Sequence, residues 1–356
     1  MKKIIFFLVV IAMAGTILVG CGGNKKAQAD GKTLVALLMP EKIEIWIAQE
    51  KQLKKTFEDA GYRTISEFAE GHVDRQVSQI ENAVLNGAKY IIVAAQDGYS
   101  LSDAVEKAKK EGVVIIANDR LIMNTLAVDY YTTFDLVHMG ELFGQYVVDK
   151  LGLEKGEKGP FNMEIFSGSP DDPNAMLFYQ GKMSKVQKYI DSGVLVVQSG
   201  QIGFDVTATL SWDTATAQAR MDNLLSAYYT GKKVDVVLSS NDSVALGVIN
   251  SLDALGYGSA GRPFPVITGQ DCEITAIKAI QDGRQSMSVF IDPVSLATIT
   301  VNLVNTLETG GKPQISTTYN NNMKEVPTTL YDLLVIDNNN WRFLIDVGYY
   351  TEDALR

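Results

Sequence analysis

Polar side chains follow four apolar runs of the sequence, at the points where the runs stop. Asp119 and Arg120 follow one such run, while Gln96, Asn241 and Asp271 lie just beyond three others. Carboxylate, amide and guanidinium groups are strong hydrogen-bonding groups that can hold a small polar ligand. A lone charged pair such as Asp119 and Arg120 could equally well form a salt bridge or cap the next turn instead of holding a ligand. The recurrence of the pattern favours a binding site.

The apolar runs indicate which elements position these groups. An unbroken Val and Ile run is typical of a parallel strand that helices cover on both faces, and ligands of such sheets bind outside the carboxyl ends of the strands. The runs alternate with amphipathic segments that end at glycine, as at Gly61, Gly87 and Gly112. The expected strands are 33–39, 63–68, 90–95 and 112–117, and then 161–166, 195–199, 234–238 and 265–268. The alternation predicts two Rossmann-like, doubly wound α/β lobes with a cleft between their strand ends.

Composition excludes several classes of protein. The 356 residues are 46% hydrophobic and 21% charged, which is typical of a globular chain large enough for two lobes. The net charge is −10 and no Lys or Arg cluster occurs, so we expect no nucleic-acid partner. Two cysteines and two histidines provide little material for a disulfide framework, a metal site or a catalytic triad. We therefore expect no metal, no cofactor and no enzymatic activity.

The N-terminus has the pattern of a secretion signal. Lys2 and Lys3 precede an apolar run over 4–19, and this run ends in the sequence Leu-Val-Gly-Cys at Cys21. The pattern resembles the lipobox of bacterial lipoproteins, which implies a signal peptide over 1–20, a lipid anchor on Cys21 and a polar tether over 21–32. The alternative is a transmembrane anchor, although the run is shorter than the roughly 20 apolar residues of a usual span.

Longer motifs along the chain resemble the type I periplasmic sugar-binding proteins of ABC importers, in particular the xylose-binding and multiple-monosaccharide-binding members. The motifs that carry the resemblance are 76–82, 118–120, 168–175, 212–213, 216–229, 240–242, 269–271 and 348–350. They occur in the family's order, and the resemblance covers essentially the whole chain from Thr33 onward.

The resemblance implies a three-stranded hinge between the lobes, with crossings near 131–134, 290–293 and 310–312. Lobe 1 would then comprise residues 33–132 and 293–310, and lobe 2 would comprise residues 133–292 and 311–356. Closure about such a hinge traps a ligand and forms the face that a membrane permease recognises.

The resemblance also implies a ligand-binding set. A pyranose presents a ring of hydroxyl groups above a patch of C–H groups, so its site needs both hydrogen-bonding side chains and aromatic rings. The residues implied for these roles are Trp46, Asp119, Arg120, Asp172, Asn174, Phe178, Trp212, Asn241 and Asp271.

Three members of this set have plausible alternative roles. Asn241 is also suited to cap a helix, although the neighbouring Asp242 could do so instead. Asp172 lies in a Pro-Asp-Asp-Pro turn, where aspartate often bonds the local backbone. Trp46 could start its helix against the core.

Three positions depart from the pattern of close sugar-binding relatives. Ile45, Ser211 and Ile291 stand where the resemblance leads us to expect arginine, arginine, and lysine or asparagine. A buried hydroxyl without a partner costs about 1–3 kcal/mol, so the usual hydroxyl pattern of a hexose would be poorly satisfied. A deoxysugar, a nucleoside or another small metabolite remains an alternative ligand.

The sequence thus predicts a monomeric, lipid-anchored receptor at the cell envelope, facing the periplasm or the exterior. It would bind a monosaccharide and deliver it to the permease of an ABC importer. An alternative with the same fold is a ligand-loaded partner of a membrane sensor kinase.

Overall fold

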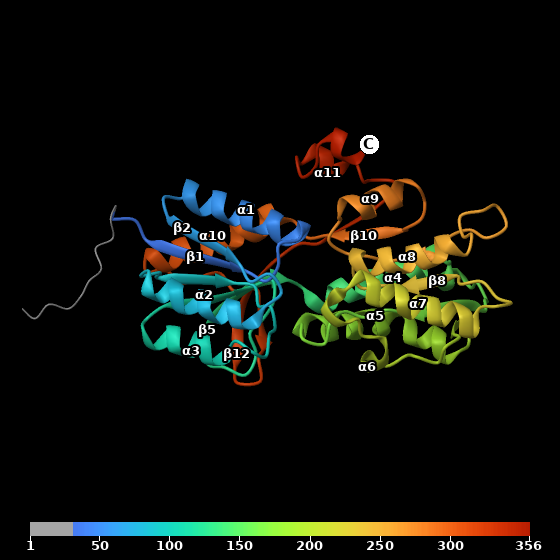
Figure 1. Ribbon diagram of the computed structural model, residues 1–356, viewed down its shortest axis with the longest axis horizontal. Helices are drawn as coiled ribbons and strands as arrows, with labels where there is room; N and C mark the ends of the chain where they lie inside the picture. The colour runs from blue at the N-terminus through green and yellow to red at the C-terminus, as the bar shows by residue number, and fades with distance from the viewer. Residues whose placement is uncertain (1–30) are drawn as a thin grey trace, which may run out of the picture.

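The computed structural model describes residues 31–356, so the predicted signal peptide, the lipidation site Cys21 and most of the tether lie outside the described residues. Figure 1 shows two α/β lobes side by side, which confirms the predicted fold class. No helix within residues 31–356 is long and apolar enough to cross a membrane.

The first lobe is built on a seven-stranded sheet with the order β11-β12-β5-β4-β3-β1-β2. Its strands are β1 (Leu34–Met39), β2 (Arg63–Phe68), β3 (Tyr90–Val93), β4 (Val114–Asn118), β5 (Val128–Phe134), β11 (Thr317–Asn320) and β12 (Glu325–Tyr331). All pairings are parallel except that of β11 with β12. Every residue of β1 and β3 is buried, as expected for strands covered on both faces.

Four helices cover this sheet. They are α1 (Glu44–Asp59), α2 (Val73–Leu85), α3 (Ser102–Lys110) and α10 (Pro293–Glu308). Helix α10 packs beside α1 although the two lie far apart in the sequence (Figure 1). The apolar faces of the helices and the buried strands form one continuous core.

The second lobe has a parallel four-stranded sheet with the order β7-β6-β8-β9 and a separate antiparallel pair, β10 with β13. The strands are β6 (Phe161–Ile165), β7 (Leu195–Val197), β8 (Val236–Leu238), β9 (Val266–Ile267), β10 (Met287–Phe290) and β13 (Leu334–Asp337). The helices are α4 (Leu136–Lys150), α5 (Pro173–Asp191), α6 (Phe204–Thr207), α7 (Thr214–Tyr228), α8 (Asp242–Ala254) and α9 (Ile274–Gln281).

The chain passes between the two lobes at three places: after β5, between β10 and α10, and between β12 and β13. The crossing predicted near 310–312 is therefore wrong, since the third passage follows Tyr331. The assignment of 317–331 to lobe 2 is wrong for the same reason. Strand β12 pairs in parallel with β5, with Thr328 opposite Tyr131, and extends the sheet of the first lobe.

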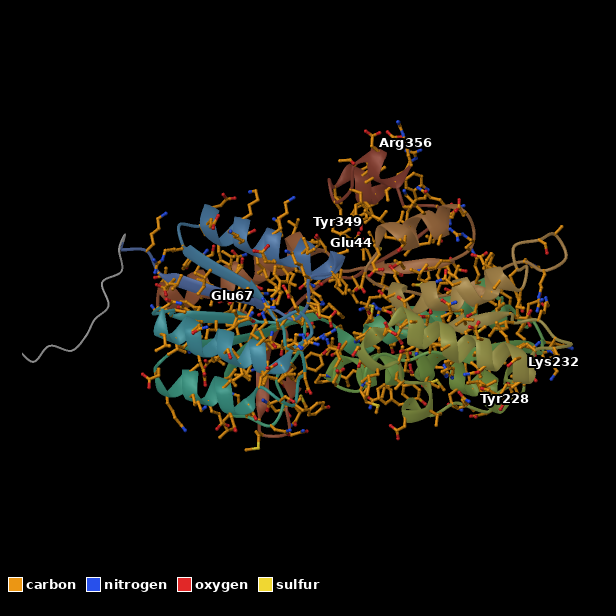
Figure 2. The ribbon with its side chains drawn as sticks, in the orientation of Figure 1. Glu44, Glu67, Tyr228, Lys232, Tyr349 and Arg356 are labelled. Carbon is orange, nitrogen blue, oxygen red and sulfur yellow. The ribbon has the colours of Figure 1, made fainter. Side chains whose placement is uncertain are left out.

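The C-terminal segment packs on the second lobe and also reaches the first. It contains α11 (Phe343–Asp346), which lies above β10 and α9 in Figure 1. The ring of Tyr349 packs edge-on against Phe290, with centroids 4.8 Å apart. The hydroxyl of Tyr350 donates to Glu44 in the first turn of α1 and lies 2.9 Å from the Cys272 carbonyl oxygen of the second lobe. Figure 2 labels Glu44 and Tyr349 close together at this junction.

We expect the substitution Tyr350→Phe to lower the free energy of unfolding by about 1–2 kcal/mol, because it removes a hydroxyl bonded to a carboxylate and to a carbonyl oxygen. Urea denaturation of the full chain measures the change. The matched control is Tyr228→Phe, which alters an exposed tyrosine and should leave stability unchanged. Equal stabilities of the two variants would contradict the prediction.

Candidate functional site

A cavity of about 200 Å³ lies between the lobes, with side chains from both lining its wall. The structure brings all of the predicted ligand-binding residues to this wall: Trp46, Asp119, Arg120, Asp172, Asn174, Phe178, Trp212, Asn241 and Asp271. The departing residues Ile45, Ser211 and Ile291 line it as well. That these side chains contact a ligand remains a prediction, because lining a cavity is a matter of position only.

Asp119 follows β4 in a left-handed backbone conformation, with φ of +63°. Its carbonyl oxygen accepts hydrogen bonds from the hydroxyls of Tyr131 and Thr133 and from Asn174 Nδ2, the last at 2.8 Å. Its carboxylate accepts from Gln49 Nε2 at 2.7 Å. The backbone and the side chain of Asp119 are therefore both fixed by contacts within the protein.

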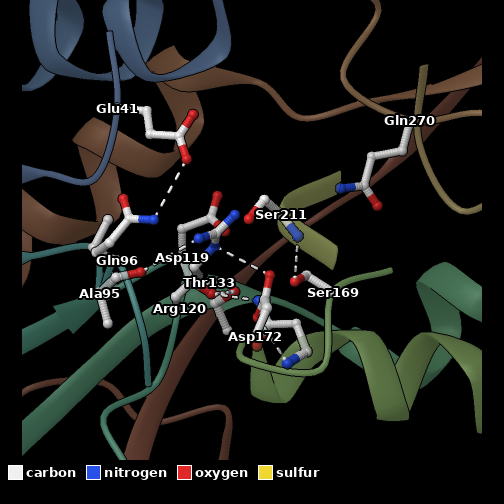
Figure 3. A network of polar contacts seen from close by, with 12 residues as sticks. Glu41, Ala95, Gln96, Asp119, Arg120, Thr133, Ser169, Asp172, Ser211 and Gln270 are labelled. Atoms are coloured by element: carbon white, nitrogen blue, oxygen red, sulfur yellow. Dashed lines mark hydrogen bonds and ion pairs between the residues drawn. The ribbon is translucent and has the colours of Figure 1, made fainter. Parts of the chain in front are cut away.

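Arg120 connects the two lobes. Its Nε lies 3.0 Å from Asp172 Oδ2 (Figure 3). Its guanidinium carbon lies 5.0 Å from the centre of the Trp46 ring. Asp172 also accepts from the backbone N–H of Asn174 and caps α5, so its predicted local role is present beside its contact with Arg120. A planar guanidinium held by a carboxylate and an aromatic ring keeps a fixed orientation.

The aromatic side of the cavity depends on a tight loop before α7. Ser211 and Trp212 both have φ of +55°, and the Ser211 N–H donates to Ser169 Oγ at 2.8 Å. The Trp212 ring lies directly on Gly168, where a Cβ would come within 2.0 Å of the ring. Phe178 packs between Trp212 and Phe134, with ring centroids 6.4 and 6.0 Å away. Phe178 and Trp212 line the cavity, and Phe134 supports Phe178 from the core.

The second lobe contributes both amide and carboxylate side chains to the cavity. Asn241 caps α8 by accepting from the Val244 N–H at 2.9 Å, so the capping role belongs to Asn241 and leaves its amide N–H groups for a ligand. Its neighbour Asp242 is instead buried and accepts from Gln285 and Ser288.

Asp271 follows β9 with φ of +97°, and its carboxylate accepts from Gln270 Nε2 at the long distance of 3.3 Å.

The lining carries a large excess of acidic groups. Among the described residues it contains six carboxylates, those of Glu41, Asp119, Asp172, Asp213, Asp271 and Glu273, and one cation, Arg120. Burial raises the pKa of Asp119 to about 6, although Gln49 and Arg120 oppose the shift. Burial and the nearby Glu273 and Asp119 carboxylates raise the pKa of Asp271 to about 8. Desolvation and like-charge repulsion are the physical causes of both shifts.

Seven further residues line the cavity that sequence reasoning did not single out as ligand-binding: Glu41, Ile43, Asp213, Thr214, Ser243, Gln270 and Glu273. Gln270 could have been found from the sequence, because it directly precedes Asp271 at a strand end. Ser243 and Glu273 each lie two residues beyond a predicted ligand-binding residue, but nothing in their local pattern marks them. No group of three or more His, Cys, Asp or Glu within residues 31–356 is arranged to hold a metal ion.

Two lobes of parallel α/β structure, three crossings of the chain and a polar, aromatic-lined cavity between them define a type I periplasmic binding protein. Residues 35–312 match the family model of the periplasmic binding protein domain, and the chain belongs to that family.

Individual relatives support this assignment. The chain is 47% identical over 350 residues to a multiple sugar-binding periplasmic protein of Azospirillum brasilense, with 98% of each chain covered. It is 33% identical over 315 residues to the D-xylose-binding periplasmic protein of Escherichia coli, with 88% of this chain and 89% of that protein covered.

A solved structure also resembles it, an ABC transporter solute-binding protein from Clostridium phytofermentans with bound β-D-glucose. The TM-score is 0.87 at 45% identity, with 91% of this chain and all of that chain (100%) covered.

We expect Gly168→Ala to displace the Trp212 ring, because the added methyl group would overlap the ring atoms. The change should shift the tryptophan emission spectrum and lower stability by about 1–3 kcal/mol. Gly203→Ala is the matched control, since a methyl group added there would have no atom within 4 Å and the φ of −61° suits alanine. An unchanged emission spectrum for Gly168→Ala would contradict the prediction.

The raised pKa of Asp271 also predicts a pH-dependent stability. Between an ordinary value of about 3.9 and the folded value of about 8, the folded chain holds a proton that the unfolded chain has lost. The contribution of Asp271 to the free energy of unfolding is fully present below about pH 4 and is lost as the pH rises toward 8.

We therefore expect the melting temperature of the ligand-free parent chain to fall relative to that of Asp271→Asn as the pH increases from about 5 to about 8. Thermal unfolding across this range checks it. Parallel pH profiles for the two chains would show that Asp271 does not titrate there.

Proposed function

We propose that this chain is an extracytoplasmic receptor that binds a monosaccharide between its two lobes and delivers it to an ABC importer. The observation that carries the proposal is the convergence of a carboxylate, a guanidinium and aromatic rings on one interlobe cavity, with Asp119, Arg120 and Trp212 as its main elements. Such groups match the hydroxyl ring and the C–H face of a sugar. The relatives named above, which are described as sugar-binding or contain glucose, support the same reading.

The proposal extends to location and partners. The periplasmic binding protein family consists of extracytoplasmic substrate-binding proteins, and we propose that this chain has no catalytic role. We also propose a lipid anchor on Cys21, which the pattern of the N-terminal sequence supports. We propose that the chain acts as a monomer and that the partner is the permease of the importer.

One observation favours a second ligand class. Ile43, Ile45 and Ile291 all line the cavity, and an apolar side chain cannot hydrogen-bond a hydroxyl placed against it. A sugar that lacks a hydroxyl facing these isoleucines would not leave a buried hydroxyl without a hydrogen-bond partner. A deoxysugar is therefore the alternative ligand, followed by a nucleoside.

Thermal unfolding of the full chain against a panel of hexoses, pentoses, deoxysugars and nucleosides tests the proposal. A ligand that binds only the folded chain stabilises it by about 2.7 kcal/mol at a hundredfold excess over the dissociation constant. We expect a shift with at least one monosaccharide, and we expect Asp119→Asn to abolish it, because the amide retains the size of the side chain but not its charge.

The melting temperature of ligand-free Asp119→Asn separates lost binding from lost folding. The outcome that would reject the sugar assignment is a shift with a nucleoside and none with any sugar.

A further inference from the structure

Asp271 is a buried carboxylate with no cation in direct contact, although the charge of Arg120 acts on it from farther away. Asp271 is 7% exposed. Among the side chains of residues 31–356, only Gln270 Nε2 donates to its carboxylate, at the long distance of 3.3 Å. Asp271 forms no ion pair with any Lys, Arg or His of that range, whereas Asp172 across the cavity is paired with Arg120 at 3.0 Å. A buried charge without a partner is costly, so the ionised form of Asp271 favours a cation beside it.

The groups around Asp271 are acceptors as well. Gln270 is 8% exposed and lines the cavity, and its Oε1 atom is buried without a hydrogen-bond partner. Figure 3 shows Gln270 apart from the bonded network, with its amide nitrogen on the side of Ser211 and its oxygen turned away. Glu273 also lines the cavity, and its carboxylate accepts from Ser243 Oγ at 3.0 Å. The two carboxylates on this part of the wall each accept from a single side-chain donor, so acceptor capacity is left over.

An uncharged hydroxyl provides one hydrogen to such a wall, whereas an ammonium group provides three hydrogens and a positive charge. Ile291 lies on the same wall of the cavity, and an apolar neighbour excludes water and strengthens electrostatic attraction. The raised pKa of Asp271 agrees with this account, because the ionised form lacks a counter-charge among the side chains in contact with it.

We propose that Asp271, Gln270 Oε1 and Glu273 form an ammonium subsite, so that the cavity binds a protonated aminodeoxy monosaccharide in preference to its neutral parent sugar. The inference rests on the proposed function and names the ligand class within it. The sugar ring would lie against Trp212 and Trp46, and its remaining hydroxyls would face Asp119 and Arg120.

A competing arrangement uses the same residues. A protonated Asp271 would donate its own hydrogen to an oxygen of a neutral sugar, and an amino group at that position would then be unfavourable. The two arrangements predict opposite orders of affinity for a neutral sugar and its amino analogue, so a direct comparison separates them.

Isothermal titration calorimetry of the full chain at about pH 7, where an ordinary amino group is mostly protonated, provides the comparison. The probes are D-glucose and D-galactose, their 2-amino-2-deoxy analogues, 3-amino-3-deoxyglucose and 6-amino-6-deoxyglucose. The neutral control for a missing hydroxyl is 2-deoxyglucose. We expect one amino sugar to bind about tenfold more tightly than its parent, because hydrogen bonds to charged groups contribute about twice as much as neutral ones.

Asp271→Asn tests the residue itself. The amide keeps the shape of the side chain and removes its charge, so the preference for the amino sugar should disappear. Asp222→Asn makes the same chemical change on an exposed face of α7, outside the cavity, and should leave the preference intact.

Three other outcomes would overturn the subsite. Neutral sugars binding as tightly as every amino analogue, or more tightly, would reject it while leaving the proposed function standing. A preference that survives Asp271→Asn would place the ammonium group elsewhere. Binding by none of the neutral or amino sugars would reject the monosaccharide function and the subsite together.

Discussion

The carbonyl oxygen of Asp119 is the atom on which the rest of the site depends. Three donors converge on it, from Tyr131 and Thr133 of the first lobe and from Asn174 of the second. They hold the left-handed conformation in which β4 ends, and this conformation directs Asp119 and Arg120 into the space between the lobes. A residue other than glycine adopts such a conformation at a cost that surrounding contacts must offset. One of the three bonds, that from Asn174, crosses between the lobes, so it supports both the site and the lobe arrangement.

The ligand-binding wall could be predicted because it follows from a general property of parallel sheets. Asp119, Asn241 and Asp271 each follow a strand. Parallel strands joined by right-handed crossovers have their carboxyl ends at the same edge of a sheet. The apolar runs of β4 and β8 are visible in the sequence without any knowledge of the fold. The aromatic members depended on the family resemblance, because a tryptophan such as Trp46 looks the same whether it faces the core or a cavity.

The predicted lobe boundary is wrong where the structure depends on strand pairing over a long sequence distance. Strand β12 contains Pro327 and two threonines rather than a continuous apolar run, and its partner β5 lies almost 200 residues earlier. No local pattern indicates that these strands meet, so the third crossing was placed too early. The left-handed backbone at Ser211 and Trp212 was also invisible, since neither residue type is typical of that conformation. Such positions are fixed by the contacts around them, here Ser169 and the open face of Gly168.

The electrostatics of the cavity connect the departures from the family pattern to the ligand. Ile45 and Ile291 stand where the resemblance leads us to expect cationic or amide side chains, and both line the cavity. Without those side chains, Arg120 is the only cation of the described lining, and Asp172 already engages it. The excess of acidic groups then falls on the second-lobe wall, where Asp271 is buried and has no cation in direct contact, only the more distant Arg120. A cavity of this kind disfavours an anionic sugar, because a further carboxylate or phosphate would add to repulsion in a medium of low polarity. The missing positive charge is thus best supplied by the ligand, which makes the two isoleucines determinants of ligand charge as well as of hydroxyl pattern.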